Sequence, residues 1–168
     1  PNFYQTPRMP VSLCPGEQVL PVRIETGTAE EAQNALDDAR ARAPLGVLVV
    51  TVSGTITVFR APLMLRSRTC FVLRKGARVV AAPDCTAGEL ILIKDAEYVS
   101  LQSAAGIIDG AMRAVAGIRI ENSGKVHLDG LSIMRCGAGG LCVTGRGKTR
   151  YADGVSLTRS AVSQCGGS

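Results

Sequence analysis

The chain has 168 residues, enough for one domain or part of one, and 46% of them are hydrophobic, with no Trp and only 4% aromatic residues. No apolar run approaches the roughly 20 residues that a membrane-spanning helix needs, so no membrane span is expected. The net charge of +5 comes from scattered Lys and Arg residues, which permits an acidic partner. Stacking aromatics are nearly absent, which argues against a nucleic-acid binder.

The first part of the chain predicts a lead-in followed by one helix. Residues 1–27 are rich in Pro and predict an extended segment. Residues 28–44 predict a helix, because Thr28 and Glu31 form a capping box and Pro44 provides a stop. Since the end of a stack of strands exposes apolar surface and unpaired edges, we expect this helix to cap the strands that follow.

From residue 45 onward, the pattern of an apolar residue, any residue and a second apolar residue recurs at intervals close to 28 residues. The first series is Phe71-x-Leu73, Val99-x-Leu101, Val126-x-Leu128 and Val155-x-Leu157. The second series is Leu63-x-Leu65, Ile91-x-Ile93, Ile118-x-Ile120 and Leu141-x-Val143. The third series is Val79, Ile107, Ile133 and Val162. Three series that advance together indicate a structural repeat.

Each repeat predicts three short strands joined by Gly-rich corners, because the apolar period is two. Coils stacked at the strand spacing of about 4.8 Å would pair each strand in parallel with its equivalent in the next coil. We therefore expect an all-β fold, in which residues 45–168 form the first coils of a parallel β-helix. Helical repeats do not fit a period of two, and a leucine-rich repeat would need an Asn ladder.

The end of the chain coincides with the end of a repeat. Residues 155–168 echo residues 126–139, but no strand follows the second copy. An open coil edge favours aggregation, so we expect further coils or a companion polypeptide to stack on the end at Ser168.

The order of these segments resembles the N-terminal region of the pectate-lyase-like superfamily of right-handed parallel β-helices. The resemblance rests on the helix "AEEAQNALDDARA", then "GVLVVTVSGTITV", "APLMLRSRTCFVLRKGARVVAA" and "GIIDG", and it covers roughly residues 28–168. It implies a right-handed β-helix with an N-terminal capping helix. The superfamily includes polysaccharide lyases, glycoside hydrolases and uronan epimerases, along with phage tailspikes and proteins without known catalysis. The "NTD", "GHG" and "RIK" motifs of its polygalacturonase-like members are absent, and the nearest stretch, "GIRIEN", lacks the Lys. The resemblance therefore carries over no catalytic residue.

Candidate substrate-binding residues come from the outward positions of the predicted strands. Lys94, Arg119 and Glu121 would lie together on one face, where Arg could bind a uronate carboxylate and Glu sugar hydroxyls. The alternative is a cross-strand salt-bridge ladder on a solvated sheet. His127, the only His, is expected outward beside Asp129, as an acid or base or as an ordinary surface residue.

The six Cys residues include no Cys-x-x-Cys pair, so a zinc site of standard spacing is not expected and no metal ligand is assigned. Three Asp-Gly pairs, at Asp109, Asp129 and Asp153, could be calcium ligands, but they are typical of turns. Cys136 and Cys165 occupy equivalent places in successive repeats, so we expect them to be adjacent, as a disulfide or as a stacked thiol pair.

These features favour part of a secreted or cell-surface carbohydrate-active enzyme that acts on a polysaccharide, with an acidic polysaccharide as one candidate and catalytic residues mostly outside this chain. No cofactor is expected. The alternative is a non-catalytic β-helix with a structural or adhesive role.

Overall fold

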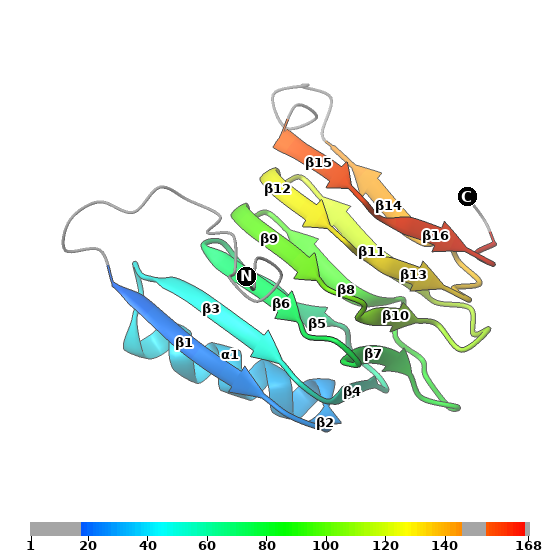
Figure 1. Ribbon diagram of the computed structural model, residues 1–168, viewed down its shortest axis with the longest axis horizontal. Helices are drawn as coiled ribbons and strands as arrows, with labels where there is room; N and C mark the ends of the chain where they lie inside the picture. Colours follow the sequence, from blue (N-terminus) through cyan, green and yellow to red (C-terminus); the bar gives the residue numbers. More distant parts are fainter. Residues whose placement is uncertain (1–17, 146–153, 167–168) are drawn as a thin grey trace.

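The computed structural model describes residues 18–145 and 154–166. Within these residues the chain is mostly β-structure with one helix, and every strand pair is parallel. The strands form three sheets, which Figure 1 shows as a continuous stack running from β1 to β15.

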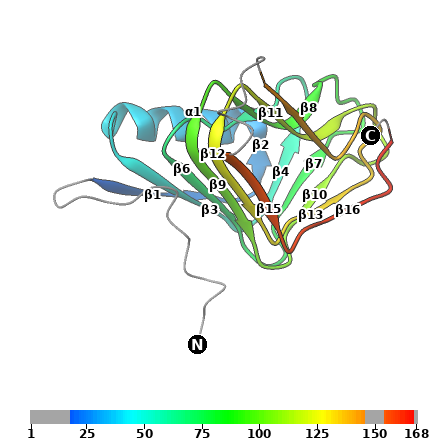
Figure 2. The same cartoon turned by 90° about the horizontal axis from the view of Figure 1, so that it is seen from above.

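The chain passes through the three sheets in turn, so that equivalent strands of successive repeats become neighbours. Sheet A contains β1 (Val19–Ile24), β3 (Val47–Val52), β6 (Thr69–Leu73), β9 (Glu97–Ser103), β12 (Gly124–Asp129) and β15 (Val155–Thr158). Sheet B contains β2 (Gly27–Thr28), β4 (Thr55–Val58), β7 (Arg78–Ala81), β10 (Ile107–Asp109), β13 (Ser132–Met134) and β16 (Ala161–Ser163). Sheet C contains β5 (Leu63–Met64), β8 (Glu89–Lys94), β11 (Ala116–Glu121) and β14 (Leu141–Thr144). This order gives a solenoid-like, β-helix-like arrangement, which Figure 2 shows along the stack.

The inward side chains of all three sheets form one apolar core. Val126 and Leu128 of β12, like Val99 and Leu101 of β9, are fully buried, whereas His127 between them is exposed. The same alternation buries Ile91, Ile93, Ile118 and Ile120 in sheet C. The period of two in the sequence thus sorts side chains into an inner and an outer set.

Helix α1 (Ala29–Arg42) lies between β2 and β3 in the chain and covers one end of the core. The expected capping box is present: the Glu31 amide donates to Thr28 Oγ1 (3.1 Å), and the Thr28 amide donates to Glu31 Oε1 (2.9 Å). The buried face of the helix consists of Ala29, Ala32, Leu36 and Ala39. The three Ala side chains are small and let the helix approach the first strands closely.

Gln33 of α1 also satisfies the edge of β5, the first strand of sheet C. Its Oε1 accepts from the Met64 amide (2.7 Å), and its Nε2 donates to the Met64 carbonyl (3.3 Å). The side-chain amide therefore replaces the peptide group that a neighbouring strand would supply.

The solenoid begins earlier than the sequence suggested. Within the expected lead-in, Val19–Ile24 forms β1 and pairs with β3 along its whole length, and Gly27–Thr28 pairs with β4. Strands therefore precede the helix as well as follow it. Residues 1–17 of the expected lead-in lie outside the described residues.

Val99, Val126 and Val155 stack on one another, as expected, in one file, by which we mean a row of equivalent side chains in successive coils. Two other expected alignments were wrong. Phe71 lies beside Leu101, and it is Thr69 that lies beside Val99. The chain runs 30 residues from Phe71 to its partner Leu101, two more than to Val99, so the alignment shifts by one pleat. In sheet B, Ile108 and not Ile107 aligns with Val79 and Ile133. Ile108 is fully buried, and a slip of one residue would have turned it outward.

At the end of the stack formed by β14, β15 and β16, side chains that continue the rows of buried core residues are exposed. Leu157 is 43% exposed, Val162 47% and Val143 49%, whereas their neighbours one rung earlier, Leu128, Ile133 and Ile120, are fully buried. No helix among the described residues is both long and apolar enough to cross a membrane.

Candidate functional site

The four residues predicted to bind substrate are divided between two sheets. Lys94 ends β8 of sheet C, and Arg119 and Glu121 lie on the neighbouring β11, where Glu121 is in register with Lys94. All three point outward, because Ile93 and Ile120 beside them are buried. Arg119 Nε lies 3.4 Å from Glu89 Oε1, so its charge is partly balanced within the sheet.

His127 lies on the outer face of sheet A and not with the other three. Its Nδ1 is 2.5 Å from Ser156 Oγ of the next strand, and Ser100 is its ladder neighbour on the other side. Asp129, expected beside it, is bound by Arg159 and Thr158 instead. His127 and Asp129 thus each have a partner on β15 or directly after it.

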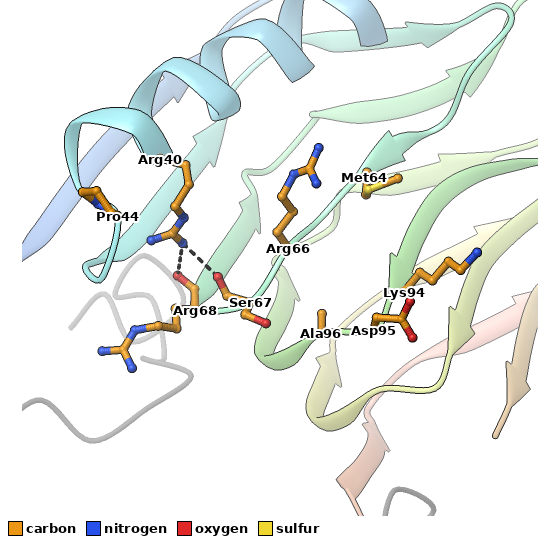
Figure 3. A pocket seen from close by; sticks show the side chains of 9 residues that line it. All are labelled: Arg40, Pro44, Met64, Arg66, Ser67, Arg68, Lys94, Asp95 and Ala96. Atoms are coloured by element: carbon orange, nitrogen blue, oxygen red, sulfur yellow. Dashed lines mark hydrogen bonds between the residues drawn. The ribbon is translucent and has the colours of Figure 1, made fainter. Parts of the chain in front are cut away.

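A cavity of about 490 Å³ lies next to Lys94, between the end of α1 and the corner that joins sheets C and A. Its lining comes from three segments, shown in Figure 3: Arg40, Pro44, Met64, Arg66, Ser67, Arg68, Lys94, Asp95 and Ala96. We call it the cationic pocket, since four of these side chains are basic and one is acidic. Met64 and Pro44 supply apolar surface beside the charges.

Arg40, in the last turn of α1, forms the helix side of the cationic pocket. Its Nη1 donates to the carbonyls of Ala43 (3.0 Å) and Gly46 (2.6 Å). Its Nη2 donates to the carbonyls of Ser67 (2.8 Å) and Arg68 (3.1 Å). Burial lowers the pKa of Arg40 below its usual value, but an Arg stays charged in proteins. Arg40 thus fixes the wall of the pocket and leaves little hydrogen-bonding capacity for a ligand.

Arg66 and Lys94 are the basic side chains that remain available to a ligand. Arg66 Nε lies 3.6 Å from Asp37 Oδ1 of α1. Both side chains are about half exposed, so this ion pair is weak. Lys94 is exposed and makes no ion pair within residues 18–145 and 154–166. Asp95, the single acid of the pocket, accepts from Asn122 Nδ2 (2.6 Å). The pocket therefore presents net positive charge to solvent.

The outward positions of the predicted strands pointed to Lys94, but they missed the contribution of α1 to the pocket. Arg40 lies in the last turn of α1, where a basic residue needs no reason beyond the helix dipole. Its long-range bonds to Ser67 and Arg68 depend on how the helix packs, and no spacing in the sequence reveals that.

The Asp-Gly carboxylates that could have bound calcium make ion pairs with Arg. Arg78 Nη2 and Arg135 Nε donate to Asp109 at 3.1 and 3.0 Å, and Arg135 Nη2 also donates to it. Burial alone would raise the pKa of Asp109, but the Arg135 and Ala111 hydrogen bonds and the two positive charges lower it overall. Among the described residues, no three His, Cys, Asp or Glu side chains are grouped to hold a metal ion. Asp153 lies outside them.

No disulfide joins the described cysteines Cys70, Cys85, Cys136, Cys142 and Cys165. Cys136 and Cys165 interact as thiols, and burial followed by the neighbouring Cys165 raises the pKa of Cys136 to about 12.

Comparison of the chain with protein-family models, curated proteins and solved structures finds no match.

Proposed function

We propose that this chain is part of a right-handed parallel β-helix of the pectate-lyase-like type, secreted or held at the cell surface, that binds an acidic polysaccharide for enzymatic processing. The observation that carries the proposal is the cationic pocket, in which Lys94 and Arg66 face solvent beside the apolar side chain of Met64. Uronate residues combine a carboxylate with an apolar ring face, so both parts of the ligand would find a partner.

In this proposal Lys94 supplies the main charge and Arg66 exchanges its weak pairing with Asp37 for a ligand carboxylate. Met64 contacts a ring face of the sugar. The outer face of β11, with Arg119 and Glu121, extends the binding surface along the stack, since a polysaccharide spans several rungs. The groups that cleave or epimerise the chain lie outside the residues described.

Binding is tested by calorimetry with oligogalacturonate or oligoalginate at low salt, with a neutral dextran oligomer as reference. We expect acidic oligomers to bind and dextran not to bind. The affinity should fall with ionic strength, because exposed charges are screened within about 10 Å at 0.1 M salt. Lys94→Gln is expected to weaken binding about 5- to 20-fold, whereas Lys75→Gln, an equal loss of charge at an exposed site outside the pocket, leaves it nearly unchanged.

Equal weakening by the two variants would mean that only net charge matters, and the cationic pocket would be rejected as the site. Turnover is measured separately, as release of unsaturated or reducing sugars. Binding without turnover by the native protein would favour the structural or adhesive role.

A further inference from the structure

Cys136 and Cys165 are opposed on adjacent rungs. They follow β13 and β16, which pair in register with Met134 beside Ser163. Two further backbone bonds continue this ladder past the strands: the Arg135 amide donates to the Ser163 carbonyl (3.1 Å), and the Gly166 amide donates to the Cys136 carbonyl (3.0 Å). Parallel neighbours are about 4.8 Å apart, which lies within the Cα separation that a disulfide accepts.

The two sulfur atoms also share one orientation. Each thiol donates to the carbonyl two residues earlier, Cys136 to Met134 (3.3 Å) and Cys165 to Ser163 (3.4 Å). Each lies close to a glycine of the preceding rung, where an added Cβ would approach Cys136 Sγ to 3.3 Å at Gly117 and Cys165 Sγ to 3.2 Å at Gly140. The repeat therefore places the sulfurs in the same corner, one above the other.

The two thiols differ in their access to solvent. Cys136 is fully buried in the core, whereas Cys165 is partly exposed on the last described rung. A reagent would therefore reach Cys165 first, and Cys136 would react from within the fold. This order matches the two steps of thiol–disulfide exchange, in which one sulfur is captured and a neighbouring sulfur resolves it.

We propose that Cys136 and Cys165 form a thiol–disulfide modification site that, on exchange with a small disulfide such as oxidised glutathione, links the last two rungs of sheet B. The Cys165 thiolate attacks the small disulfide, forms a mixed disulfide and releases one thiolate. The Cys136 sulfur then loses its proton and attacks Cys165 Sγ, which releases the second thiolate. The protein loses two electrons and two protons, and the small disulfide becomes two thiols.

The link would hold the outermost described rung, whose apolar side chains are half exposed, to the buried rung beneath it. It would close a loop of about 30 residues, for which the chain-entropy model gives a substantial stabilisation. Oxidation is thus expected to raise the melting temperature by roughly 5–10 °C. The proposal does not depend on glycan binding.

The test is to equilibrate the folded protein in glutathione buffers of increasing oxidised fraction, block remaining thiols with N-ethylmaleimide and map the digest by mass spectrometry. We expect one link, between Cys136 and Cys165, reversed by a reducing buffer. The tryptic peptide 136–146 also contains Cys142, so Cys142→Ser serves as the control and should keep the link. Cys165→Ser should lose both the link and the rise in melting temperature.

The proposal is overturned if both thiols remain open to alkylation in the most oxidising buffer, if Cys165 stops at the mixed disulfide, or if it pairs with Cys142. Cys165 lies on the outer rung, so its replacement tests the link even where Cys136→Ser fails to fold.

Discussion

Arg135 binds the carboxylate of Asp109 from the next rung of sheet B with both Nε and Nη2. The Asp109 side chain is 2% exposed, whereas Arg135 is 40% exposed and Arg78, on the other side, is 44% exposed. A nearly buried carboxylate is therefore held between two guanidinium groups that remain partly hydrated. The arrangement ties three successive strands of sheet B together through side chains as well as backbone.

Asp109→Asn is expected to lower the free energy of unfolding by about 1–3 kcal/mol. This is less than the cost of opening a fully buried ion pair, because the Arg groups can regain water. Urea denaturation measures the change. Asp129→Asn is a matched control, since Asp129 binds Arg159 in a similar way but is 17% exposed, with its partner 65% exposed. A larger loss at Asp129 than at Asp109 would contradict the importance we give to burial.

The stability that Asp109 contributes is expected to depend on pH. Its pKa is lower in the folded protein than in the unfolded chain, where a free carboxyl has a pKa of about 3.9. The contribution is therefore complete above that value and is lost as the pH falls through the folded pKa. The free energies of unfolding of the native protein and Asp109→Asn should differ by a constant amount between pH 5 and pH 7, and the difference should begin to shrink as the pH falls below about 4. A difference that persists unchanged to pH 2 would disagree with this account.

Arg40→Ala is expected to destabilise the fold by about 2–4 kcal/mol, because it removes the donors for four carbonyl groups at the junction of α1 with the strands. Arg42→Ala, in the same last turn but exposed, is expected to cost less than about 1 kcal/mol. Thermal unfolding of the two variants checks the contrast. Similar losses of stability in the two variants would show that the helix needs only a positive charge at its end, and not the hydrogen bonds of Arg40.

Gln33→Ala is expected to expose the edge of β5. The Met64 amide should then exchange its hydrogen about 10-fold faster or more, because its acceptor is lost and one unmade hydrogen bond is worth about 1–3 kcal/mol. Hydrogen exchange followed by NMR provides the measurement. Asn34→Ala, on the exposed side of the same helix, is the control and should leave Met64 protected.

Leu128 and Leu157 occupy neighbouring rungs of one file and allow a direct comparison. Leu128→Ala is expected to cost about 2–5 kcal/mol, as at other buried sites, whereas Leu157→Ala should cost less than about 1.5 kcal/mol. Chemical denaturation distinguishes them. Equal costs would mean that the surface around Leu157 is covered in solution.

The sequence predicted the fold well where the physical signal is local. The capping box at Thr28 and the inward positions of Val99, Val126 and Val155 follow from short-range patterns, and the structure has both. The alignment of Phe71 failed because an alternating pattern fits equally well after a shift of two residues, and only the corner lengths decide between the two.

The candidate site was less accessible to sequence reasoning. Lys94 and Glu121 are ladder partners, as their spacing indicated. The cationic pocket also needs Arg40 and Arg68, which reach it through the packing of a helix against a corner. Such contacts join residues whose separation follows no period, so a single sequence contains no signal for them.

The corners that join the strands differ in length from one coil to the next, although the strands still pair in register. Along the file Val50, Phe71, Leu101 and Leu128, consecutive members are 21, 30 and 27 residues apart in the chain, yet each pairs directly with the next. Insertions and deletions at these bends are thus absorbed outside the core. A protein built in this way can enlarge one bend into a binding loop, or exchange whole turns with a relative, without redesigning its interior.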